Sequence, residues 1–95
     1  MNDRDVKANP TNRHGRYKDN REYAGFVRRS VRAYGRRVAD GDVEALAEML
    51  QLARELDAAI DNAVDGLRAH GYSWSEIGER AGITKQTAHE RWAKR

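Results

Sequence analysis

The sequence predicts an all-α protein in which a long helical hairpin precedes two short C-terminal helices. Apolar residues recur at steps of three and four along two long segments, which is the period of an amphipathic helix. The 95 residues include one proline, and hydrophobic residues make up 39% of the chain against 35% charged residues. This composition suits a small helical protein with a modest core and disfavours a β-rich fold.

The length and residue usage exclude several classes of protein. A chain of 95 residues leaves little room for two independent cores. The absence of cysteine excludes disulfide scaffolds, thiol catalysis and cysteine-ligated zinc, and it is compatible with a reducing compartment. No stretch approaches the 18 or so apolar residues of a membrane span, and the start MNDRDVKANP lacks the apolar core of a secretory signal. We therefore expect a soluble cytoplasmic protein with no membrane partner.

Charge is distributed unevenly along the chain. Residues 1–41 hold eleven Lys or Arg against five Asp or Glu, residues 42–69 hold two against seven, and residues 70–95 hold five against three. A polyanion would therefore be attracted to both ends of the chain and repelled by its middle, provided that the three blocks stay apart in space.

The first part of the chain predicts a tail and a helix. Residues 1–18 lack helical periodicity and contain Pro10 and Gly15, so we expect a flexible basic tail. A helix is expected from Asn20, whose side chain can cap its first turn. Its glycines each cost about 1 kcal/mol relative to alanine, so the helix should depend on packing. Its apolar stripe consists of Tyr23, Phe26, Val27, Val31, Tyr34 and Val38.

The second helix is expected from Val43 to Ala69, after a tight reversal at Gly41 and a cap at Asp42. Its apolar residues step by three and four without interruption, as in a coiled-coil heptad. This stripe consists of Leu46, Met49, Ala53, Leu56, Ile60, Ala63 and Leu67. We expect residues 19–69 to form a helical hairpin that serves as a support or a dimerisation unit.

Two short helices are expected after this hairpin. Gly71 should end the long helix in a Schellman motif, and Ser73 with Glu76 forms a capping box for a helix that starts at Trp74. That helix should stop near Gly82, and Thr84 should cap a last helix that runs to the C-terminus. The side chains expected to converge inward are Ile77, Ala81, Ile83, Ala88 and Trp92, with Gly78 allowing close helix approach.

Two capped helices joined by a glycine-containing turn form a helix-turn-helix arrangement, which occupies residues 70–95 in this chain. The segments Gly71–Gly78 and Gly82–Ala88 resemble the DNA-binding helix-turn-helix of small bacterial regulators, particularly those of actinobacteria and their phages. They are also similar to region four of sigma factors. The resemblance spans residues 71–92 and implies an all-α fold with a C-terminal helix-turn-helix that binds DNA. The sequence departs from that pattern at Gly78, where alanine is usual, and at Arg91, where an apolar side chain is common.

The exposed side chains of the last helix are the candidate DNA contacts. Gln86 can pair with adenine, Lys85 can donate to guanine, and Glu90 can accept from cytosine. Hydroxyl groups and the remaining cations suit phosphates. These polar residues could instead only solvate the outer face of an amphipathic helix. The full set is Thr84, Lys85, Gln86, Thr87, His89, Glu90, Arg91 and Lys94.

Other polar clusters carry less weight. Asp57, Asp61 and Asp65 share one helical face, but this pattern is more typical of a solvated surface than of a metal site. The histidines are too far apart in sequence to form a ligand set, so we expect no metal and no cofactor. The sequence contains no nucleophile elbow, phosphate-binding glycine loop or zinc-protease motif, and we expect no enzymatic activity.

Arginines of the first helix can contact DNA phosphates or pair with the acidic second helix, and the internal pairing is slightly favoured.

The leading hypothesis is a sequence-specific DNA-binding protein that acts as a transcriptional regulator and is nucleoid-associated when bound to double-stranded DNA. It is expected to form a homodimer through its first two helices, although an intramolecular bundle could cover the same apolar stripe. The alternative hypothesis is an assembly or polymerase-binding adaptor, such as a phage packaging subunit or a sigma-like protein. RNA polymerase would be a partner in that case.

Overall fold

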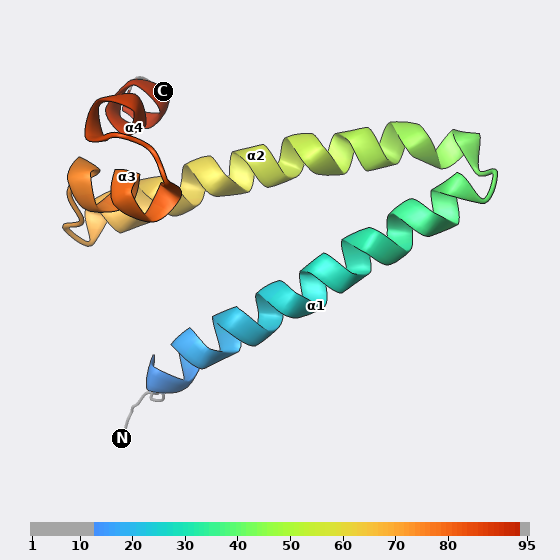
Figure 1. Ribbon diagram of the computed structural model, residues 1–95, viewed down its shortest axis with the longest axis horizontal. Coiled ribbons are helices and arrows are strands. Elements are labelled where there is room, and N and C mark those ends of the chain that lie inside the picture. Colours follow the sequence, from blue (N-terminus) through green and yellow to red (C-terminus); the bar gives the residue numbers. More distant parts are fainter. Residues whose placement is uncertain (1–12, 94–95) are drawn as a thin grey trace. The chain divides into compact units, whose positions relative to one another are not determined.

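The computed structural model describes residues 13–93, and every element in this part of the chain is helical (Figure 1). Four α-helices follow one another as α1 (Arg13–Ala39), α2 (Leu46–Ala69), α3 (Trp74–Ala81) and α4 (Lys85–Trp92), with a short 3-10 turn at Val43–Ala45 before α2. The chain divides into an N-terminal unit, Met1–Leu46, and a C-terminal unit, Ala47–Arg95. The predicted pairing of α1 with α2 crosses this division and stays a prediction.

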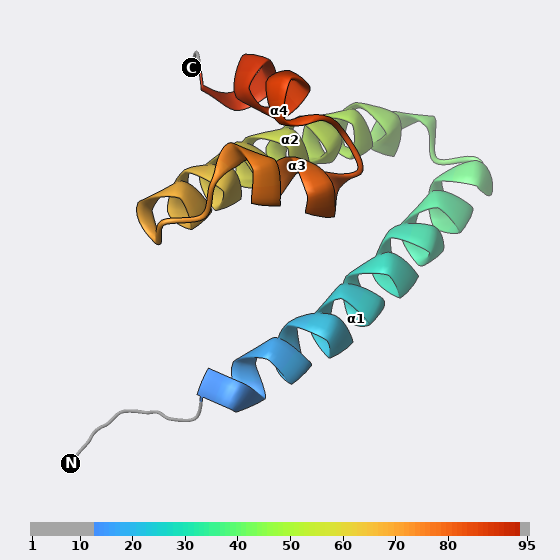
Figure 2. The ribbon, with the colours of Figure 1, turned by 60° about the vertical axis from the view of Figure 1, so that its left-hand side comes forward.

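The first helix begins earlier than the sequence predicts. It starts at Arg13 and continues without interruption through Gly25 and Gly35 (Figure 2). The prediction that Asn20 caps this helix is wrong, and the predicted tail of residues 1–18 overlaps the helix by its last six residues. An asparagine inside a helix costs only a few tenths of a kcal/mol, whereas each added residue contributes a hydrogen bond. Residues 1–12 lie outside the described part of the chain.

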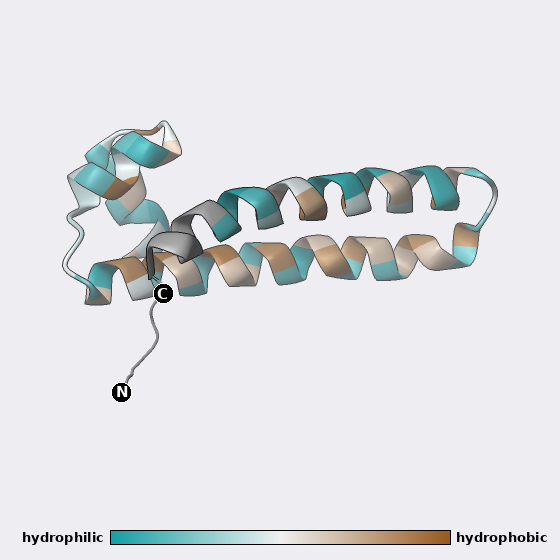
Figure 3. Cartoon of the chain, turned by 90° about the horizontal axis from the view of Figure 1, so that it is seen from below, coloured by the Kyte–Doolittle hydropathy of each residue, from teal (hydrophilic) through white to brown (hydrophobic). Residues whose placement is uncertain are grey.

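The reversal before α2 follows the prediction. Gly41 adopts a φ of 124°, and the carboxylate of Asp42 accepts a hydrogen bond from the amide of Ala45 at 3.2 Å. The helical segment starts at Val43 as expected, but its first turn is a 3-10 turn and α2 itself begins at Leu46. Figure 3 shows apolar positions recurring along the length of α2, whereas α1 is mainly hydrophilic.

Two glycines in left-handed conformation end α2 and α3. At Gly71 (φ 100°) the amide donates to the Arg68 carbonyl at 2.9 Å, and the next amide, that of Tyr72, donates to the Leu67 carbonyl at 3.1 Å. Gly82 (φ 77°) and the residue after it repeat this pattern, donating to carbonyls three and five residues back. Both sites are Schellman motifs, and both predicted helix ends are confirmed.

The core of the C-terminal unit lies where α2, α3 and α4 meet. Val64 of α2 packs with Ile77 of α3, and α4 contributes two buried side chains. The prediction that Ala81 points inward is wrong. Ala81 is the last residue of α3, where the chain turns away, and its side chain remains exposed. The buried residues are Val64, Ile77, Ala88 and Trp92, and the partly buried Trp74 and Ile83 pack against them.

The close approach at Gly78 is also confirmed. A Cβ atom at this position would lie 2.9 Å from the carbonyl oxygen of Ile83 and 3.0 Å from that of Thr84. These contacts are with backbone atoms, which cannot rotate away as a flexible side chain can. Gly78 therefore sets how closely α3 lies against the start of α4.

We expect Gly78→Ala to destabilise the protein, because overpacking costs about 1–3 kcal/mol and improved helix propensity offsets only about 1 kcal/mol of it. Urea unfolding should show a lower midpoint than for the wild type. Gly66→Ala is the matched control, since Gly66 lies inside α2 with nothing within 4 Å of its Cβ position. This control should stabilise the protein by up to about 1 kcal/mol. Equal stability of the two variants would contradict the proposed role of Gly78.

Candidate nucleic-acid interface

The polar face of α4 is defined by its cap and by its two buried side chains. The hydroxyl of Thr84 accepts a hydrogen bond from the amide of Thr87 at 3.0 Å, so the predicted cap is confirmed. Ala88 is completely buried. At about 100° per residue, Gln86 and Glu90 project roughly 160° away from the buried side of the helix. The face that they share therefore points outward.

The two outward side chains are joined to each other. The amide nitrogen Nε2 of Gln86 donates to the carboxylate oxygen Oε2 of Glu90 at 3.2 Å. This (i, i+4) hydrogen bond orients the Gln86 amide along the helix surface. A pair of this kind presents both a donor and an acceptor to whatever meets this face of α4.

The remaining candidate residues surround this face at different positions. Lys85 is exposed in the first turn, and the half-buried Thr87 accepts a hydrogen bond from the Thr84 hydroxyl at 2.9 Å. The guanidinium group of Arg91 lies 5.6 Å from the ring centre of Trp92. Lys94 lies outside the described residues.

His89 belongs to a stack of side chains that sequence analysis missed. Its ring meets the ring of Trp74 edge-on, with 5.5 Å between the ring centres. The guanidinium group of Arg68 lies 4.7 Å from the centre of the same indole and donates to the Tyr72 carbonyl at 2.9 Å. Three helices thus contribute one side chain each to the stack. The position of Arg68 in the last turn of α2 predicts a contact with a backbone carbonyl. Nothing in the residue spacing predicts that Arg68 and His89 both contact the ring of Trp74.

The start of α3 carries the predicted capping box. The amide of Glu76 donates to the Ser73 hydroxyl at 3.0 Å, and the amide of Ser73 donates to the Glu76 carboxylate at 2.8 Å. The hydrogen bond from the Ser73 backbone lowers the pKa of Glu76 below its ordinary value, with help from the Ser73 hydroxyl and the positive charge of Arg80. Glu76 is therefore ionised under neutral conditions and holds the first turn of α3 in place.

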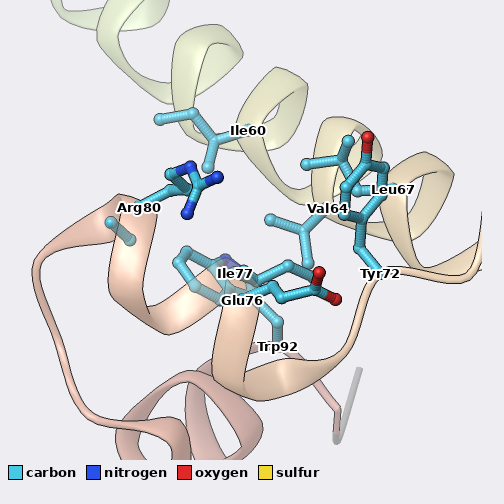
Figure 4. A pocket seen from close by; sticks show the side chains of 9 residues that line it. Ile60, Val64, Leu67, Tyr72, Glu76, Ile77, Arg80 and Trp92 are labelled. Carbon is cyan, nitrogen blue, oxygen red and sulfur yellow. The ribbon is translucent and has the colours of Figure 1, made fainter.

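An open apolar groove of about 400 Å³ lies beside the core of the C-terminal unit (Figure 4). Ile60 and Leu67 of α2, together with Tyr72, remain more than 40% exposed along it. Glu76 and Arg80 supply the charged groups of its lining. Among the described side chains, no group of three histidines or carboxylates is placed to hold a metal ion.

Comparisons with protein-family models, with curated proteins and with solved structures found no match to this chain. None of the helices within residues 13–93 has the length and apolar composition needed to cross a membrane.

We expect the capping box to make stability depend on pH. Because folding lowers the pKa of Glu76, its contribution is present above the ordinary glutamate value of 4.5 and is lost as the pH falls through the lower value of the folded state. Glu76→Gln retains an acceptor but does not titrate. Urea unfolding over a pH series should show the wild type more stable near neutrality, with the difference shrinking in acid. A difference that stays constant or grows in acid would contradict this assignment.

Proposed function

We propose that this protein binds duplex DNA with sequence specificity and acts as a transcriptional regulator. In this proposal α3, the turn at Gly82 and α4 form a helix-turn-helix, and α4 enters the major groove. The observation that carries the proposal is the outward polar face of α4, held on a helix that is capped at Thr84 and packed closely against α3 at Gly78.

The chemistry of this face suits base edges in the major groove. The Gln86 amide can donate to and accept from adenine, and the Glu90 carboxylate can accept from the cytosine amino group. The hydrogen bond between these two side chains holds the Gln86 amide in one orientation. Lys85 stands in the first turn of α4, the end that enters the groove first. The cations Arg91 and Lys94 suit phosphate contacts, which set the register without reading sequence.

A homodimer is the second part of the proposal. Within the C-terminal unit the α3–α4 pair covers α2 around Val64, whereas Leu50 and Leu56 remain more than half exposed. A heptad stripe is the seam of a coiled coil and requires a partner helix. Because α1 carries an apolar stripe of its own, two copies supply four such stripes, enough for a four-helix bundle. Two helix-turn-helix units would then read two half-sites about 34 Å apart.

Gln86→Ala should change the preference for one or two base pairs by about 1–3 kcal/mol. Selection from a random duplex pool, followed by binding titrations at several salt concentrations, would measure this change. Gln51→Ala is the matched control, because Gln51 makes the same (i, i+4) hydrogen bond to Glu55 on α2, away from the proposed interface. Its sequence preference should equal that of the wild type. If no duplex binds to the wild type at low salt, the adaptor hypothesis replaces this proposal.

Leu56→Asp should convert the dimer into a monomer, because it places a charge on the exposed apolar stripe of α2. Light scattering should then give a mass near 10.8 kDa for the variant and twice this mass for the wild type. Ala58→Asp adds the same charge on the opposite face of α2 and should leave the dimer intact. A wild-type mass near 10.8 kDa across micromolar concentrations would refute the dimer.

A further inference from the structure

The arginines of α1 gather on one face of the helix. Residues 19–39 contain six arginines and two carboxylates, and all six arginines are exposed. At about 100° per residue, five of them fall within an arc of roughly 100°. The face extends over about 22 Å of helix at 1.5 Å per residue. This arginine face consists of Arg21, Arg28, Arg29, Arg32 and Arg36.

The apolar stripe of α1 lies on the other side of the helix. Tyr23 and Phe26 stack on this stripe with 6.2 Å between their ring centres, and Val27, Val31 and Tyr34 continue it. Its centre stands roughly 160° from the centre of the arginine face. A helix that packs against the stripe therefore leaves the arginine face in solvent. This geometry weighs against the expected neutralisation of these arginines by the acidic residues of α2.

The centre of the arginine face has no side chain. Gly25 lies there, and the guanidinium nitrogens of Arg29 and Arg28 stand 3.3 Å and 3.9 Å from the position where its Cβ would be. Both guanidinium groups therefore lie close to the bare backbone at Gly25. Planar donors arranged in this way can each bind a phosphate through two hydrogen bonds.

We propose that the arginine face of α1 binds the sugar-phosphate backbone of duplex DNA as a second contact surface. The inference rests on the proposed function, which names duplex DNA as the partner. It adds a sequence-independent contribution to affinity from α1, which lies outside the helix-turn-helix. Duplex DNA carries one negative charge per about 1.7 Å of its axis. This linear charge density is higher than that of the arginine face over its whole length. The surface would bind every duplex sequence alike, because it reaches phosphates and not base edges.

An anionic membrane fits this helix less well. A helix that lies in a membrane interface buries its apolar stripe and keeps its cations near the headgroups. α1 shares this arrangement of charge and apolar surface, but in the proposed dimer its apolar stripe packs against other helices and is not free to insert. A polyanion that approaches from solvent meets all five guanidinium groups without uncovering the stripe.

The test compares the full-length wild type with the triple variant Arg28→Gln, Arg32→Gln, Arg36→Gln. Glutamine preserves helix propensity, and circular dichroism checks that α1 is retained. Loss of three phosphate contacts should reduce the slope of log affinity against log salt by about 2.7. Between about 50 mM and 200 mM salt, the wild type should lose about 40-fold more affinity than the variant. The sequence preference set by α4 should not change.

Single variants supply a matched control. Arg32→Gln lies on the arginine face and should reduce the salt slope by about 0.9. Arg37→Gln removes the same charge from the same helix, but Arg37 borders the apolar stripe and should leave the slope unchanged.

Each outcome separates this inference from the proposed function. If the triple variant has the same salt slope as the wild type and Gln86→Ala alters the base preference, the inference is overturned and the proposed function stands. A reduced slope without any base preference supports the arginine face and refutes sequence-specific reading by α4. If the triple variant loses binding to anionic phospholipid vesicles while its affinity for duplex DNA is unchanged, the inference is overturned in favour of a membrane surface.

Discussion

The tertiary structure of the C-terminal unit depends on the contact between Gly78 and the carbonyl groups of Ile83 and Thr84. Without a side chain at this point α3 lies directly against the start of α4, and Ala88 is buried completely. An isolated helix of eight residues is not stable in water, so α4 owes its order to this contact, to its cap and to the burial of Ala88 and Trp92 in the core. The direction of its outward polar face is therefore set by a glycine on another helix.

The start of the helical segment at Val43, the starts of α3 and α4 and the ends of α2 and α3 could be predicted because their signals are local. The predicted continuation of the last helix to the C-terminus is wrong, because α4 ends at Trp92 with Ala93 as its C-cap. Asp42, Ser73 and Thr84 each find a hydrogen-bond partner three residues away, and Gly71 and Gly82 end their helices through carbonyls within five residues. The residues of such motifs are neighbours in the chain, so their signals can be read from the sequence without knowledge of the tertiary packing. The start of α1 shows the limit of this reasoning. A residue able to cap a helix does not stop one, because each residue added to an existing helix contributes a further hydrogen bond.

Contacts between helices could be predicted only in part. The inward positions of Ile77, Ala88 and Trp92 follow from helical period, and the outward positions of Gln86 and Glu90 follow from them. The stack of Arg68, Trp74 and His89 depends on how three helices cross, which no spacing in the sequence encodes. Ala81 was misassigned for the same reason, because period alone does not show where a covering helix ends.

The small core links folding to association. Four hydrophobic side chains are buried among the described residues, and large apolar side chains of α1 and α2 remain exposed. Small units of this kind are marginally stable, and a ligand that binds only the folded state stabilises it by mass action. In the proposed dimer a second copy and a DNA duplex are both such ligands, because each binds only the folded state. Linkage makes this coupling reciprocal, so DNA binding should strengthen self-association to the same extent that self-association strengthens DNA binding. The stripe of α2 and the polar face of α4 would then act as one thermodynamic unit, although they share no side chain.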